Sequence, residues 1–254
     1  MSKHKWRSLL LSALSAGAGW FIPRLLPLQQ FSFVMLCLAS ALQTGLMFGL
    51  PGFLLLKAFA PEDALPGALL RPPASLTAGL AMLAAVAYTL VGSLIGALAH
   101  AMLTALGMEV ALPPPIVPGS PVELMVATLT IALITAACEE LFFRMALPRV
   151  LGRWLKPLHA SLISSLLFAL LHFSAVAFLP LLVFALLLHR VRQVTGSYLT
   201  LVIFHAMYNF SILLINYAAA QPSLGMIGLS LAVFVVAVRR LLREERNEIT
   251  HSGL

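Results

Sequence analysis

The sequence is poor in charge, and in acidic residues above all. Charged residues make up 10% of its 254 residues, and Asp63 is the only aspartate. A protease that uses a pair of aspartates is therefore excluded. The sequence also lacks His-Glu-x-x-His, the helical motif of many zinc proteases, and Gly-x-Ser-x-Gly, which frames the serine of many hydrolases. The two cysteines, Cys37 and Cys138, fall in apolar segments, where a thiol behaves as a small hydrophobic group.

Apolar residues, by contrast, make up 61% of the chain and recur in long runs from one end to the other. A helix that crosses a bilayer needs about 20 such residues. The pattern therefore predicts an all-α fold, a polytopic transmembrane helix bundle of about eight spans that forms a single transmembrane domain over 1–254. The expected spans are 8–26, 31–56, 75–106, 122–148, 157–174, 175–189, 197–218 and 222–240.

The basic residues lie between these apolar segments, where they indicate topology. With the N-terminus in the cytoplasm, all 16 Lys and Arg residues except Arg24 fall on the cytoplasmic side, as the positive-inside rule requires. We therefore expect both termini to be cytoplasmic. Residues 1–19 also resemble a cleavable signal peptide, which remains the alternative for that segment. The net charge of +7 forms no continuous basic patch in the sequence, so no nucleic acid partner is expected.

Two adjacent carboxylates, Glu139 and Glu140, interrupt the apolar segment 122–148. Ionisable groups at membrane depth are costly, so they are candidates for function. On a helix, Glu140 and Arg144 are four residues apart with the acid first, the favourable order for an ion pair. Glu139 points about 100° away from Glu140. It is thus the carboxylate without a local partner, free to act as a base.

Two further polar pairs lie on later apolar segments. Phe168 and His172 share one helical face, and so do His205 and Asn209. Each pair taken singly is better explained as a structural contact between helices. Together with Glu139 they supply a carboxylate, two imidazoles and an amide. Hydrolysis of a peptide bond requires a base for water and fixed donors for the oxyanion, so this set predicts a hydrolytic site.

The order Glu-Glu-x-x-x-Arg, Phe-x-x-x-His and His-x-x-x-Asn on successive apolar helices resembles the CAAX-protease and bacteriocin-processing (CPBP, or Abi) family. That family includes the type II CAAX prenyl endopeptidase. The resemblance runs from Thr128 to about Ser211 and implies an all-helical core, placed here at about 122–218. It identifies the chain as an intramembrane endopeptidase.

The resemblance also implies roles for the motif residues. Glu139 and His172 would activate the water, and His205 with Asn209 would hold the oxyanion. The supporting residues would be Glu140, Arg144 and Phe168. No cofactor is favoured, because an asparagine suits an oxyanion donor better than a zinc site. The zinc alternative would use Glu139, His172 and His205 as ligands.

The linear positions of these residues raise a difficulty. If 122–148 and 157–174 both cross the membrane fully, Glu139 and His172 differ in depth by roughly 15 Å. A longer fourth helix, or a short and displaced fifth, would bring them level.

Other functions remain open. The rival to a protease is a non-catalytic scaffold or transporter with a buried Glu-Arg-His network. For the protease, the expected partners are membrane lipids and a membrane-associated protein or peptide substrate. Leu/Ala-rich spans and Arg-rich loops favour a bacterial inner membrane.

Overall fold

The computed structural model describes residues 3–64, 66–110, 112 and 114–251, and within them every regular element is a helix. The α-helices are α1 (Lys3–Phe21), α2 (Phe33–Thr44), α3 (Leu50–Phe59), α4 (Pro66–Leu69), α5 (Ser75–Ala105), α6 (Pro121–Ala127), α7 (Thr135–Glu140), α8 (Leu147–Leu151), α9 (Pro157–Leu170), α10 (Ala175–Thr195), α11 (Tyr198–Tyr217) and α12 (Leu224–His251). The predicted all-α class is confirmed.

Short segments of wider or tighter helix join some of these elements. Three are π-helical: η3 (Gly45–Gly49), η5 (Thr128–Ile134) and η6 (Leu141–Ala146). Three are 3₁₀ turns: η1 (Ile22–Leu25), η2 (Leu28–Gln30) and η4 (Pro61–Ala64). As a result, α2, η3 and α3 form one continuous rod from Phe33 to Phe59, and α6 to α8 form another from Pro121 to Leu151.

Each of the eight apolar segments expected from the sequence folds as a helical rod. In the described part of the chain, six of these rods are long and apolar enough to cross a membrane. The two others are α1, which carries Lys3, Lys5 and Arg7, and α9, which has only 14 residues. The chain is therefore an integral, multi-pass membrane protein.

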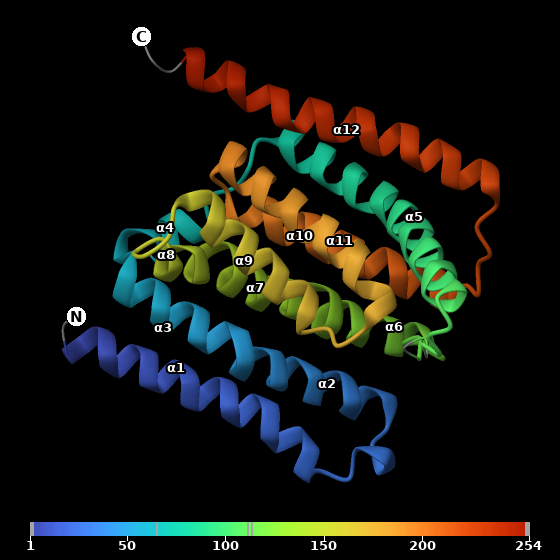
Figure 1. Cartoon of the computed structure of the whole chain (residues 1–254), viewed down its shortest axis with the longest axis horizontal. Helices are drawn as coiled ribbons and strands as arrows, with labels where there is room; N and C mark the ends of the chain where they lie inside the picture. Colours follow the sequence, from blue (N-terminus) through green and yellow to red (C-terminus); the bar gives the residue numbers. More distant parts are fainter. Residues whose placement is uncertain (1–2, 65, 111, 113, 252–254) are drawn as a thin grey trace.

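The rods stack in layers (Figure 1). α1 lies beside α2 and α3 at one side of the bundle, and α12 lies beside α5 at the other, with α7, α9, α10 and α11 between them. α5 contacts α10, α11 and α12 through a face of small residues that includes Ala81, Ala84 and Ala85. Small side chains let helices approach closely, which drives association where lipid removes the hydrophobic force.

The outer surface of the bundle is apolar. Leu10, Leu14, Leu98 and Leu229 are all more than 60% exposed, on α1, α5 and α12. Such a surface would be an aggregation hazard in water, whereas in a bilayer it contacts lipid chains. The polar residues that are buried inside this apolar bundle are therefore candidates for function.

The rod that carries Glu139 and Glu140 packs backbone to backbone on the α2–η3–α3 rod. A Cβ atom added at Gly52 would lie 3.1 Å from the backbone nitrogen of Phe142, and one at Gly49 would lie 2.8 Å from the Sγ atom of Cys138. Glycine at these positions lets the two rods meet. π-helical segments, which are rare and concentrate at functional sites, lie on both sides of this contact.

The close approach at Gly52 can be tested against Gly45, which lies in the same rod. A Cβ atom added at Gly45 would have no neighbouring atom within 4 Å. Replacing either glycine by alanine gains up to about 1 kcal/mol of helix propensity. At Gly52 the added methyl group meets backbone, and overpacking costs about 1–3 kcal/mol. Thermal unfolding in detergent should therefore show that Gly45→Ala is at least as stable as the parent protein and that Gly52→Ala is less stable. Equal melting temperatures would contradict the contact.

Candidate active site

The polar centre of the bundle forms around the end of α7. Glu140 is fully buried, and its Oε1 atom lies 3.1 Å from Nη1 of Arg144, whose side chain is 2% exposed. The ion pair expected from their four-residue spacing is present, and it joins the end of α7 to the π-helical segment η6. Either charge buried alone would strongly destabilise the fold. Buried together, the two opposite charges compensate one another.

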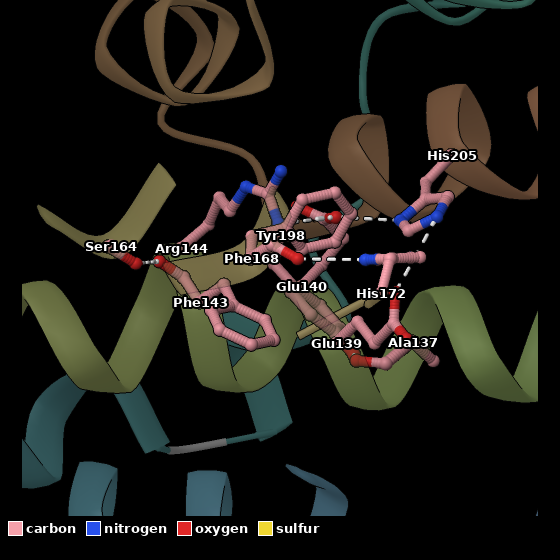
Figure 2. A network of polar contacts seen from close by, with 10 residues as sticks. All are labelled: Ala137, Glu139, Glu140, Phe143, Arg144, Ser164, Phe168, His172, Tyr198 and His205. Carbon is pink, nitrogen blue, oxygen red and sulfur yellow. Dashed lines mark hydrogen bonds and ion pairs between the residues drawn. The ribbon is translucent and has the colours of Figure 1, made fainter. Parts of the chain in front are cut away.

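His205, on α11, stands between the two glutamates. Its Nδ1 atom lies 2.7 Å from Oε1 of Glu140, and its Nε2 atom lies 3.8 Å from Oε2 of Glu139 (Figure 2). An ionised carboxylate only accepts hydrogen bonds, so with Glu140 ionised Nδ1 donates to it. The Nε2 atom then faces Glu139, at ion-pair distance but beyond the range of a direct hydrogen bond. The structure therefore places one imidazole between the two carboxylates.

The ring of Phe168 is the apolar counterpart of this network. It is fully buried on α9 and contacts three polar side chains. The guanidinium carbon of Arg144 lies 4.3 Å from the ring centroid, the His172 ring 4.9 Å and the His205 ring 5.9 Å. A cation over an aromatic face is attracted by its quadrupole. One phenyl ring thus brings Arg144 and both histidines to the same place (Figure 2).

His172 lies just beyond the end of α9 and is held by that helix's own backbone. Its Nδ1 atom is 2.8 Å from the carbonyl oxygen of Phe168. Because a carbonyl only accepts, Nδ1 carries the hydrogen, and the neutral imidazole presents a free lone pair at Nε2. This bond fixes the tautomer that a base requires.

The lengths of two helices bear on the depth difference expected between Glu139 and His172. The fourth rod has 31 residues, and α9 has 14. Glu139 lies 12 residues before the end of its rod at Leu151, and His172 lies 15 residues after Pro157, across the intervening turn. These separations correspond to about 18 Å and about 22 Å along the helices. The two distances differ by about 4 Å, because the fourth rod continues to Leu151. The estimate of 15 Å assumed that both segments cross the membrane fully, and α9, with 14 residues, is too short for that.

Asn209 lies one turn beyond His205 on α11. Its Nδ2 atom donates to the carbonyl oxygen of Ile131 at 3.3 Å, within the π-helical segment η5. An amide nitrogen carries two hydrogens, so one N–H remains for another acceptor. Asn209 is thereby fixed against the rod that carries the glutamates.

Two further side chains hold this rod by its backbone and were not foreseen from the sequence. The Tyr198 hydroxyl donates to the carbonyl of Ala137 at 2.8 Å, and the Ser164 hydroxyl donates to the carbonyl of Phe143 (Figure 2). No motif marks either residue. A single tyrosine or serine at a helix interface has no sequence signature, because its value depends on which carbonyl of the neighbouring rod lies within reach.

An aromatic stack lies next to His172. Phe173, the following residue, has a positive φ of 50° and is 70% exposed. Its ring contacts Trp20 at the end of α1, with 5.2 Å between centroids, and the Arg24 guanidinium lies 3.7 Å from the Trp20 ring centroid. Left-handed backbone is unfavourable for a bulky residue and is seen mostly at functional sites. The only basic residue expected on the outer side, Arg24, thus belongs to the surroundings of the site.

The zinc alternative can be compared with these positions. In residues 3–64, 66–110, 112 and 114–251, no three His, Cys, Asp or Glu side chains converge as ligands for a metal ion. Glu139, His172 and His205 therefore do not form a zinc set in this arrangement, and Nδ1 of His205 is bound to Glu140. We derive no step through a metal.

Comparison with known proteins addresses the family. Residues 121–211 match the family model described as type II CAAX prenyl endopeptidase Rce1-like, just over a third of the chain. No curated protein and no solved structure matches the chain. The matched segment begins at α6 and includes Glu139, His172, His205 and Asn209, so the resemblance is confirmed where the polar side chains gather. Residues 121–211 are therefore similar to the Rce1-like type II CAAX prenyl endopeptidases, a family of proteases.

Proposed function

We propose that this protein is an intramembrane endopeptidase in which Glu139 and His172 activate water to hydrolyse a peptide bond of a membrane-associated protein or peptide. The observation that carries this proposal is the way the two histidines flank the Phe168 ring beside the glutamates. Each imidazole is held at Nδ1 by a fixed partner, so that Nε2 is left for chemistry. That arrangement supplies preorganised groups for general base and donor roles.

The reaction follows from the proton positions. Water bound between Glu139 and Nε2 of His172 gives a proton to the carboxylate, and its oxygen attacks the carbonyl carbon of the substrate. Doubly protonated His205 donates from Nδ1 to Glu140 and from Nε2 to the oxyanion. The remaining N–H of Asn209 is the second donor. When the C–N bond breaks, the proton on Glu139 passes to the leaving amine.

Glu140 and Arg144 act in this scheme through His205. Their ion pair orients Oε1 of Glu140 toward Nδ1. A carboxylate partner fixes the orientation of an imidazole ring. Glu140 is thus a positioning residue, and Glu139 is the catalytic one.

The substrate class is part of the proposal. The matched family's description names a CAAX prenyl endopeptidase, so proteins or peptides anchored at the membrane are the natural candidates here. We place the protein in a bacterial inner membrane. This placement rests on the Leu/Ala-rich spans and on the predominance of Arg among its basic residues.

A scaffold or transporter is the second candidate. The observation in its favour is that the Arg144–Glu140–His205 network is buried and would stabilise the bundle whether or not catalysis occurs. Intramembrane carboxylate and histidine networks also relay protons. The two candidate functions differ in the role of Glu139. Glu140 already neutralises Arg144, so a scaffold does not need the Glu139 carboxylate, whereas the protease needs it as the base.

Substitution of the two glutamates separates these roles. Glu139→Gln should lower cleavage of a membrane-anchored peptide by roughly 10²–10⁴-fold, the usual contribution of a general base, and should leave the amount of folded protein unchanged. Glu140→Ala should lower both, because an unpaired buried Arg144 costs about 3–5 kcal/mol. Cleavage is followed by mass spectrometry and folding by size-exclusion chromatography. Full activity of Glu139→Gln would reject the proposed mechanism.

His172 offers a test of how the water is held. In His172→Asn the side-chain amide can still donate to the Phe168 carbonyl, but its nitrogen has no lone pair to accept a hydrogen bond from the water. We expect kcat to fall by about 10²-fold or more with KM nearly unchanged. His159→Asn, at an exposed histidine near the start of α9, is the matched control and should behave as the parent protein. A change in KM alone would assign His172 to binding.

The metal-free form of the mechanism makes a separate prediction. Purified active protein should contain much less than one zinc per chain and should keep its activity after dialysis against a chelator, because the carboxylate alone takes the proton. Zinc content is measured by atomic emission alongside the cleavage rate. Zinc at one per chain, lost and restored together with activity, would establish the metal-assisted alternative.

A further inference from the structure

The ring of Phe59, at the end of α3, is approached by two cations from different parts of the chain. The Nζ atom of Lys5 lies 5.3 Å from the ring centroid, and the guanidinium carbon of Arg153 lies 5.1 Å from it. Lys5 belongs to α1, and Arg153 follows α8, the last helix of the rod that carries Glu139. Figure 1 shows these three helix ends at the same end of the bundle.

In the part of the chain that the structure describes, no ion pair neutralises the positive charge at this place. Among the described residues, neither Lys5 nor Arg153 has a carboxylate within ion-pair distance. Asp63, in the nearby turn η4, forms an ion pair with Arg149 instead. An aromatic face attracts each cation but removes no charge, so the two cations still repel one another. An anion bound to both would relieve that repulsion.

Exposed tryptophans place this cluster at the level of lipid headgroups. Trp6 is 63% exposed and directly follows Lys5, and Trp154 is 66% exposed and directly follows Arg153. Tryptophan concentrates at the boundary between hydrocarbon and water. The anion available in quantity at that depth is the phosphate of a phospholipid, and guanidinium and ammonium groups both bind phosphate well.

We propose that Lys5, Arg153 and Phe59 form a binding site for an anionic phospholipid headgroup. The guanidinium binds two phosphate oxygens, the ammonium binds a third, and the Phe59 ring supports both cations. The bound lipid joins α1 to the turn that follows α8, and so fixes the outermost helix to the rod of the candidate active site. The proposal is independent of the enzymatic activity, because no group of the candidate active site takes part in it.

Tryptophan fluorescence reports on the site directly. In a Trp20→Phe background, Trp6 and Trp154 are the only tryptophans left of the three in the chain. The purified full-length protein is reconstituted with brominated phosphatidylglycerol or brominated phosphatidylcholine, and quenching is measured as one lipid replaces the other. We expect the anionic lipid to bind preferentially.

The preference should fall by about thirtyfold in Lys5→Gln/Arg153→Gln. Each interfacial cation strengthens the binding of an anionic lipid by about five- to sixfold, and the two factors multiply. The charge-preserving pair Lys5→Arg/Arg153→Lys should retain it and shows that the site tolerates substitution. Arg190→Gln, at an exposed arginine that bonds only to Gln193 across a helical turn, is the control and should also retain it.

Three outcomes would overturn the proposal. The first is equal quenching by the two lipids in the parent background, and the second is a preference that survives loss of both cations. The third is complete suppression of the preference by millimolar inorganic phosphate, which would assign the site to a free anion. If the preference for the anionic lipid persists in the presence of phosphate, the result supports a lipid headgroup as the ligand of this site.

Discussion

A single carboxylate oxygen carries the polar centre of this bundle. Oε1 of Glu140 lies within hydrogen-bond reach of both Arg144 and His205, on a side chain with no exposed surface. Removing charges from water costs several kcal/mol per ion, so the three groups are stable there only together. The network also fixes the direction of His205, since with Nδ1 bound to Glu140 the Nε2 atom must face Glu139. Stability and the geometry of the candidate site thus rest on the same contact.

Helix length, more than motif spacing, brings the second histidine into place. α9 ends at Leu170 after only 14 residues, and the last carbonyls of a helix have no partner within it. His172 satisfies one of these by donating to Phe168. If α9 continued as an α-helix, the Phe168 carbonyl would accept from the backbone N–H of His172, and the imidazole would lose this acceptor. The end of α9 is therefore a condition for the orientation of His172.

Much of this arrangement is predictable from the sequence, and the rest depends on contacts between helices. The eight apolar segments predicted the rods, and the spacing of Glu140 and Arg144 predicted their ion pair, because both are local properties of one helix. The partner of His205 was not predictable, since it depends on how α11 lies against α7. The same holds for the π-helical segments and for Tyr198, whose acceptor on α7 is a backbone carbonyl. The proposed roles of Glu139 and Asn209 remain predictions.

The way the polar side chains divide their hydrogen bonds bears on whether the site catalyses a reaction. His172 and Asn209 each bind one backbone carbonyl and retain a second group, a ring nitrogen or an N–H, for another partner. His172 is exposed and Asn209 is partly exposed, so this reserve is open to a partner from outside the bundle. A catalytic site requires it, since a side chain must be held rigidly by one bond while the other faces the reacting atoms. The same reasoning explains the position of Glu139. It lies next to Glu140, the carboxylate that neutralises Arg144, but points to another side of the helix.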